Sequence, residues 1–169
     1  LVKGLYLAIP VSEFKLAEAP GWFNIISGDT DDYLDPIESV LAGHGYRPDY
    51  RMPGVGAPYW VFRQFLDSPT SRDAMVVLQL VLSALSVYVL GLLATRISGS
   101  ERTGLLVYTL FLLSAYSSWY DAYLSSDSFS TSSIIFGAYF LQRALDRSSL
   151  GALLLAGVLL TWLIFLRPV

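Results

Sequence analysis

The sequence predicts an all-α membrane protein, with several transmembrane helices and an extracytoplasmic loop that carries short amphipathic surface helices. Three observations support this fold class. Charged residues make up only 15% of the 169 residues, against about 25% in ordinary soluble domains. Hydrophobic residues make up 54%. The charges are also uneven, because positions 1–73 hold ten Asp or Glu and six Lys or Arg, whereas positions 74–169 hold four and five.

The intervals between charged residues predict four transmembrane helices. The first interval, 74–95, has 22 uncharged residues, and at about 1.5 Å per residue it covers a hydrocarbon core about 30 Å thick. The later intervals predict spans over about 103–120, 128–142 and 149–166. The third begins with several serines, so we expect its first turn to lie at the water interface or to face protein. A soluble four-helix bundle would show a polar stripe along each helix, which these segments lack.

Arginines in the short loops predict the orientation. The segments 96–102 and 143–147 each contain two Arg, whereas the segment 121–127 contains two Asp and no basic residue. Cytoplasmic loops retain Lys and Arg, so we expect the two arginine loops inside. Segment 121–127 then lies on the same extracytoplasmic side as positions 1–73. The predicted location is the plasma (inner) membrane, with several passes.

Positions 1–73 are predicted to form the first extracytoplasmic loop. Residues 1–11 are too short to span and are interpreted as the end of a preceding span. A first amphipathic helix is predicted from a Thr30 cap to Gly43 or Gly45, and a second over Tyr59–Leu66. The apolar face of the first helix consists of residues at helical spacing, Tyr33, Leu34, Ile37, Val40 and Leu41. A loop rich in Pro and Gly connects the two helices.

Composition excludes some classes of function. A pI near 5.0, without a run of Lys or Arg, argues against a nucleic-acid partner. The chain has no Cys, which excludes disulfides and thiolate metal sites. The predicted spans contain no internal charge, which argues against a transporter.

Several short motifs follow one another in a particular order. Asp29 and Tyr33 form a D-x-x-x-Y spacing before the first amphipathic helix. The later motifs are the Pro-rich element of Arg51, Pro53 and Tyr59-Trp60, then Ser126-Asp127 at the start of a span that leads to Arg143, and finally Leu166-Arg167-Pro168. In this order and spacing the chain resembles membrane-embedded glycosyltransferases of the GT-C class. The most similar families are the protein O-mannosyltransferase-like and aminoarabinose-transferase-like enzymes, which depend on lipid-phosphate sugars.

The resemblance implies an enzyme that moves a hexosyl or pentosyl group from a polyprenyl-phosphate-linked donor to an acceptor hydroxyl on the extracytoplasmic side. The acceptor would be a glycan, a lipid or a protein, and membrane lipid would surround the chain. It implies that Asp29 is the catalytic residue and that Tyr33, Asp127 and Arg51 bind substrate. Arg51 stands where the family has Lys, and extra residues separate it from Tyr59-Trp60. Since such enzymes have more than four spans, we expect this chain to be a fragment that is inactive alone.

The chemistry of these side chains leaves alternatives open. A carboxylate at the membrane surface suits a general base, because partial desolvation raises its pKa, but Asp29 also suits a helix cap. Asp127 would orient the acceptor, join Asp29 at a divalent metal, or mark the end of a span. No other cofactor is indicated. Arg51 would hold phosphate oxygens or lie at the interface as an ordinary surface arginine.

Other residues and functions are weaker candidates. Arg47 and Arg63 are further phosphate-binding candidates, and His44 would be either a metal ligand or a solvated turn residue. The competing functions are a non-enzymatic polytopic component, such as a transporter fragment or an assembly scaffold, and an oligosaccharide ligase or polymerase that uses lipid-linked donors.

Overall fold

The computed structural model describes residues 30–47, 53–114 and 120–166, and within these ranges the chain contains helices and no strand. The all-α prediction is confirmed for this part of the chain. The elements are α2 (Thr30–Leu41), α3 (Gly56–Arg63), α4 (Ser68–Ser98), α5 (Glu101–Leu112), the short 3-10 helix η1 (Tyr120–Ala122), α7 (Ser126–Arg147) and α8 (Leu150–Leu166).

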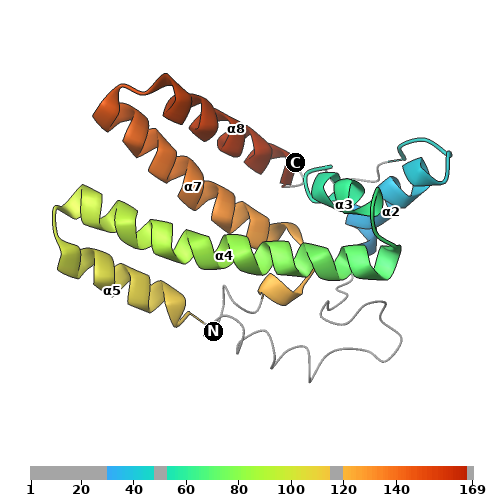
Figure 1. Ribbon diagram of the computed structural model, residues 1–169, viewed down its shortest axis with the longest axis horizontal. Helices are drawn as coiled ribbons and strands as arrows, with labels where there is room; N and C mark the ends of the chain where they lie inside the picture. The colour runs from blue at the N-terminus through green and yellow to red at the C-terminus, as the bar shows by residue number, and fades with distance from the viewer. Residues whose placement is uncertain (1–29, 48–52, 115–119, 167–169) are drawn as a thin grey trace.

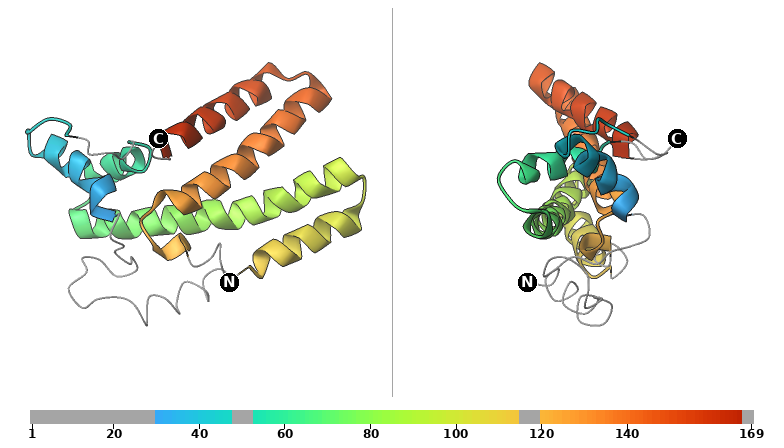
Figure 2. Two further views of the ribbon diagram at one scale, coloured as in Figure 1. Left: turned by 180° about the vertical axis from the view of Figure 1, so that it is seen from behind. Right: turned by 90° about the vertical axis from the view of Figure 1, so that its right-hand side faces the viewer.

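The four long helices form two hairpins that lie side by side (Figure 1). Helices α4 and α5 make one hairpin, α7 and α8 make the other, and α4 packs against α7. Both hairpin turns lie at the same end of the bundle, and α2 and α3 lie at the opposite end in both side views (Figures 1 and 2). The turn end is held by the Arg96 guanidinium, whose Nε lies 3.3 Å from Asp146 Oδ2.

Helix α4 is the longest element and contains the first predicted span, 74–95. Its 31 residues extend over about 46 Å at 1.5 Å per residue. The helix begins at Ser68 because Asp67 caps it, accepting a hydrogen bond from the Thr70 N–H at 3.0 Å. It ends at Ser98 and is followed by Gly99, whose φ of 67° favours glycine. Among the described residues, α4 is the one helix long and apolar enough to cross a membrane.

The other three predicted spans differ in length from the helices found. Helix α5 has 12 residues, and residues 115–119 of the predicted span 103–120 lie outside the described residues. Helix α8 is apolar over 17 residues and matches the predicted span 149–166. Helix α7 has 22 residues but does not meet the same criterion of apolarity.

The prediction that residues 143–147 form a loop is wrong. Helix α7 continues to Arg147, and the turn is made at Ser148, which adopts a left-handed φ of 49°. The charged residues stay helical because Asp146 accepts a hydrogen bond from Gln142 at 2.8 Å, one turn earlier, and pairs with Arg96 of α4. Both arginine segments nevertheless lie at the same end of the bundle, as expected.

Small side chains are buried in both α4 and α7, which pack against each other. The serines at the start of α7 are buried, namely Ser126, Ser128, Ser130, Ser132 and Ser133, and so are Ser83 and Ser86 of α4. The expectation that this first part of the third span faces protein is therefore confirmed. Small residues allow helix backbones to approach closely.

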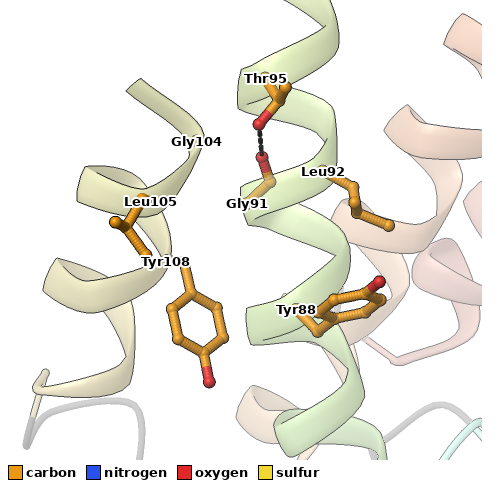
Figure 3. A pocket seen from close by; sticks show the side chains of 7 residues that line it. All are labelled: Tyr88, Gly91, Leu92, Thr95, Gly104, Leu105 and Tyr108. Atoms are coloured by element: carbon orange, nitrogen blue, oxygen red, sulfur yellow. Dashed lines mark hydrogen bonds between the residues drawn. The ribbon is translucent and has the colours of Figure 1, made fainter. Parts of the chain in front are cut away.

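Glycines form the contact between α4 and α5 (Figure 3). A Cβ on Gly104 would lie 2.7 Å from the Gly91 carbonyl oxygen and 1.7 Å from Thr95 Oγ1, so only glycine fits here. A shallow groove of about 350 Å³ runs along this contact, between Tyr88 and Tyr108. Its walls are mainly apolar side chains of the two helices.

The packed core lies at the end of the molecule that holds α2 and α3. It combines residues from every element there, namely Tyr33, Leu34, Ile37, Val55, Tyr59, Met75, Val76, Leu124, Phe129 and Leu166. Toward the turn end, the outer faces of the long helices are apolar but exposed. Examples are Leu105 and Leu110 of α5 at 66% and 63%, and Leu150 and Val158 of α8 at 69% and 65%.

Helix α2 matches most of the first predicted amphipathic helix. It ends at Leu41, and Gly43 and Gly45 follow with φ of 79° and 80°. Tyr33, Leu34 and Ile37 are buried as predicted, but Val40 and Leu41 are more than one-third exposed because the helix projects beyond α3. Thr30, the predicted cap residue, is already helical, and Asp29 lies outside the described residues.

Candidate functional site

The start of α2 packs against the segment that precedes α7. The Thr30 hydroxyl donates to the Leu124 carbonyl oxygen at 3.3 Å, and the Tyr33 hydroxyl donates to Ser126 Oγ at 3.1 Å. All four residues are buried. These contacts join positions more than ninety residues apart in the sequence, and they bring together the two acidic segments that were predicted to share one side of the membrane.

Gln79 of α4 donates hydrogen bonds to the backbone of the segment that precedes α7. The Gln79 side chain is fully buried, and its Nε2 donates to the carbonyl oxygens of Tyr123 at 3.0 Å and Ser125 at 3.4 Å. Its Oε1 has no hydrogen-bond partner among the described residues. Asp121 is 1% exposed and accepts a hydrogen bond from the Ser128 hydroxyl at 2.7 Å. The segment is therefore held by Gln79 of α4 through its backbone and by Ser128 of α7 through the Asp121 side chain.

A buried cation lies beside α2, in the first turns of α4. Arg72 is 9% exposed, and its Nη1 lies 3.5 Å from Asp31 Oδ1. The Nε atom of Arg72 is buried and has no hydrogen-bond partner among the described residues. Burial raises the pKa of the nearby Asp35 carboxyl, Asp31 raises it further, and Arg72 opposes the shift. Arg72 is thus the cation that balances the acidic face of α2 at this point.

Helices α2 and α3 are joined by a second, complete ion pair. Arg63 Nε lies 2.9 Å from Glu38 Oε1, and Arg63 Nη2 lies 3.2 Å from Glu38 Oε2, so the guanidinium holds both carboxylate oxygens. The buried Tyr59 hydroxyl also donates to Glu38 and lies 3.0 Å from Ser68 Oγ. The hydrogen bonds from Arg63 lower the pKa of Glu38 despite its partial burial.

The Gly54-Val55-Gly56 sequence brings the start of α3 into close contact with α2 and α8. The Gly54 N–H donates to the Phe165 carbonyl oxygen near the end of α8 at 2.8 Å, and a Cβ on Gly54 would lie 2.3 Å from that oxygen. A Cβ on Gly56 would lie 2.7 Å from Ile37 Cγ1. Val55, between them, is fully buried. The two glycines are therefore required by close approach of α2 and α8.

An apolar cavity of about 290 Å³ adjoins this region. It lies between four helices, and Pro58 of α3, Phe129 of α7 and Trp162 of α8 form part of its wall. Phe129 follows Ser128, the partner of Asp121, so the cavity is one residue away from the polar segment. The arrangement thus places an apolar recess next to a cluster of buried polar groups.

Of the predicted substrate-binding residues, the structure places two. Tyr33 lies in the contact between α2 and α7, with its hydroxyl on Ser126. Asp127 is exposed on the first turn of α7, where its Oδ2 accepts a hydrogen bond from the Ser125 hydroxyl at 3.4 Å. Asp29 and Arg51 lie outside the described residues, as does the Arg167-Pro168 pair.

The weaker candidates have ordinary structural roles. Arg63 is occupied by Glu38, which argues against a free phosphate-binding role. Arg47 and His44 are exposed in the turn after α2. For a divalent metal, the described residues contain no group of three or more His, Cys, Asp or Glu side chains that fits a metal ion. The proposed pair of Asp29 and Asp127 includes a residue outside this part of the chain.

Arg72, Gln79 and Asp121 are polar groups of this region that were not predicted. Two signals in the sequence point to them. Arg72 and Asp73 stand directly before the uncharged interval 74–95, at the level where a span meets water, and Gln79 is the single amide within that interval. A polar side chain in a predicted span is a site candidate by default.

Comparison with known proteins adds no relative. No family model matches the chain, no curated protein matches it, and no solved structure matches it.

Proposed function

We propose that this chain is part of a multi-pass membrane glycosyltransferase that moves a sugar from a polyprenyl-phosphate-linked donor to an acceptor hydroxyl on the extracytoplasmic side. The observation that carries the proposal is the contact between the start of α2 and the 121–127 segment, through Thr30, Tyr33, Leu124 and Ser126. Asp29 directly precedes Thr30, and Asp127 directly follows Ser126. The motif order that resembles GT-C enzymes supports the same assignment.

A membrane location is supported by apolar exposure. Leucines and other large apolar side chains cover the outer faces of α4, α5 and α8, with exposures of 50% to 69% at Leu85, Leu105, Leu154 and Leu150. Soluble proteins rarely leave apolar areas of this extent in water. Lipid tails would cover these faces, and the two hairpins would cross the bilayer together.

The distribution of charge supports the orientation. Arg96, Arg102, Arg143 and Arg147 all belong to the end that holds the hairpin turns. The opposite end holds α2, whose first turn carries Asp31 and Asp32. By the positive-inside rule the turn end faces the cytoplasm, and α2 faces the outside of the plasma membrane.

The proposed reaction needs a base, a phosphate partner and an apolar recess. Asp29 accepts the proton of the acceptor hydroxyl, the acceptor oxygen bonds to the anomeric carbon, and the bond from that carbon to the phosphate oxygen breaks. The phosphate stays on the polyprenyl chain as leaving group. Asp127 orients the acceptor, and Arg51 stabilises the phosphate charge. The cavity beside Phe129 and Trp162 suits the first part of the prenyl chain.

Substitution of Asp29 by Asn in the full-length protein tests the proposal. The protein is reconstituted in vesicles with radiolabelled polyprenyl-phosphate hexose or pentose and a membrane extract as acceptor, and labelled acceptor and free polyprenyl phosphate are counted. We expect the wild type to transfer label and Asp29→Asn to lose at least a hundredfold in rate, as for a general base. Glu101→Gln, at the turn end, is the matched control and should keep its activity. Equal transfer by wild type and Asp29→Asn would remove the catalytic assignment.

A further inference from the structure

The guanidinium of Arg72 is buried, and one of its N–H donors has no acceptor among the described residues. We propose that its guanidinium binds the phosphate group of the polyprenyl-phosphate substrate, in addition to any contact made by Arg51. The inference deepens the proposed function and depends on it for the identity of the lipid. It was not visible in the sequence motifs, because none of them includes Arg72.

The hydrogen bonds of Arg72 are incomplete. A guanidinium carries five N–H donors in a planar fork, and the contact from Nη1 to Asp31 Oδ1 is long, at 3.5 Å. The Nε donor is buried and without a partner among the described residues. A buried charge that lacks hydrogen-bond partners is costly, so an added anion with several oxygens would stabilise this position. Carboxylate and phosphate oxygens both match the fork, and phosphate is the one of the two that the lipid substrate of the proposed enzyme carries.

Arg63 provides the comparison within the same structure. It lies at the same end of the molecule and is also shielded from water, with a side chain 21% exposed. Both carboxylate oxygens of Glu38 and the Leu66 carbonyl oxygen accept its hydrogen bonds. Of the two arginines, Arg72 is therefore the one whose Nε donor has no acceptor in the part of the chain that the structure describes.

The position of Arg72 along α4 suits a lipid phosphate. Arg72 belongs to the first turns of the helix, and the uncharged interval begins at Ala74. In a spanning α4, this places the guanidinium where the hydrocarbon core gives way to the headgroup layer. The phosphate of a polyprenyl lipid lies in that layer, whereas its chain enters the core.

Asp31 provides access to the buried guanidinium. Its side chain is 56% exposed while that of Arg72 is 10% exposed, so the pair lies at the edge of the packed region. Within the part of the chain that the structure describes, the contact of Asp31 with Arg72 is long, at 3.5 Å, and its carboxylate would compete with an incoming phosphate for the same donors. An incoming phosphate would therefore displace Asp31 from the exposed side of the pair.

Binding of polyprenyl phosphate, without any sugar, tests this inference separately from catalysis. The full-length protein in nanodiscs is titrated with a fluorescent polyprenyl phosphate. We expect Arg72→Gln to raise the Kd at least tenfold and Arg72→Lys, which keeps the charge but loses the fork, to raise it about threefold. Asp31→Asn should leave the Kd unchanged or lower it, because it removes the competing carboxylate. Arg102→Gln, at the turn end, is the charge-matched control and should bind as the wild type does.

The controls separate phosphate binding from a structural role. If Arg72 only held α2 to α4 through Asp31, then Asp31→Asn would weaken binding as much as Arg72→Gln, and the inference would be wrong. Thermal unfolding of each variant shows whether it is folded, and if Arg72→Gln does not accumulate, Arg72→Lys decides. Equal displacement of the probe by phosphatidylglycerol or by inorganic phosphate would overturn the assignment to a polyprenyl phosphate.

Failure of this inference can be distinguished from failure of the proposed function, because one is measured by binding and the other by sugar transfer. A wild type that binds polyprenyl phosphate through Arg72 but transfers no sugar supports this inference and removes the glycosyltransferase. A wild type that transfers sugar while Arg72→Gln binds the probe normally removes this inference alone. A wild type that does not bind the probe overturns it as well.

Discussion

Glu38 is the side chain that joins α2 to α3, because it accepts hydrogen bonds from both Arg63 and Tyr59. The hydrogen bonds from Arg63 hold its pKa below the ordinary value of 4.5. A carboxyl whose pKa is lowered by folding contributes stability above its unfolded-state pKa and loses that contribution as the pH falls through the folded-state pKa. The contact between α2 and α3 should therefore weaken in acid.

We expect the wild type to become less stable as the pH falls below about 4.5, and Glu38→Gln to remove this part of the pH dependence. At neutral pH the variant should lose about 1 kcal/mol of unfolding free energy, as expected for a partly exposed charge pair. Thermal unfolding of the detergent-solubilised protein between pH 3 and 7, a range of about four units around the carboxyl pKa, measures both effects. Parallel pH profiles for wild type and variant would contradict the prediction.

Tyr33 carries the contact between α2 and α7 through a single hydroxyl. Tyr33→Phe removes the 3.1 Å hydrogen bond to Ser126 and should cost about 1 kcal/mol, since it leaves a buried hydroxyl without its donor. Tyr88→Phe is the control, because Tyr88 is 57% exposed and should change stability little. Amide hydrogen exchange of α2 reports the loss locally, and unchanged protection in Tyr33→Phe would show that the hydroxyl does not hold the helix.

The sequence predicted Tyr33 as a site residue but not Arg72, and this difference has a physical reason. Tyr33 lies at a helical spacing from Leu34 and Ile37 and follows Asp29 in a recognisable motif. The importance of Arg72 comes from burial against α2, which is 41 positions away in sequence at Asp31. No periodicity reports which arginine will be enclosed and which, like Arg63, will find a complete carboxylate partner.

At the scale of elements, close helix contacts depend on glycines. Gly104→Ala would place a methyl group 2.7 Å from the Gly91 carbonyl oxygen and against Thr95. We expect α5 to separate from α4 and the unfolding free energy to fall by about 1–3 kcal/mol, as for overpacking. Gly157→Ala is the matched control, because nothing lies within 4 Å of a Cβ there, and it should stabilise α8 slightly. A midpoint in Gly104→Ala equal to that of the control would contradict this account.

The lengths of the helices were predicted less well than their number and order. Charges were used to mark the ends of the spans, but α4 begins before Arg72 because Asp67 caps it. Helix α7 continues past Arg143 because Asp146 has partners in Gln142 and Arg96. A charged residue ends a membrane interval but does not end a helix, so cap residues and tertiary ion pairs decide the boundary.

At the scale of the whole molecule, the two hairpins predict a topology that single cysteines test directly. The 169 residues contain no Cys, so within them each introduced thiol reports alone once any Cys elsewhere in the full-length protein has been replaced by Ser. In the full-length protein, Glu101→Cys and Arg147→Cys should react with a membrane-impermeant maleimide only from the cytoplasmic side. His44→Cys and Asp127→Cys should react only from outside. All four residues are exposed. Labelling of His44→Cys and Glu101→Cys from the same side would remove the proposed orientation.

The arrangement of whole hairpins follows from the sequence only in part. The shared end of the two arginine segments was predicted from charge alone and is found in the structure. In the order α5, α4, α7, α8 across the bundle, Gly104 approaches α4 closely and the first serines of α7 are buried. Small residues allow such contacts at many positions, so the pairing of helices could not be predicted from them.

In the membrane orientation proposed above, the length of α4 would make the protein sensitive to bilayer thickness. About 46 Å of helix stands against a hydrocarbon slab of about 30 Å, and the surplus at the α2 end carries Arg72 and Asp73. Vesicles made from lipids with longer tails would submerge these two charges, and the bilayer would have to thin around the bundle to keep them hydrated. Membranes markedly thicker than the roughly 33 Å that the uncharged interval 74–95 covers should therefore be poor hosts for this chain.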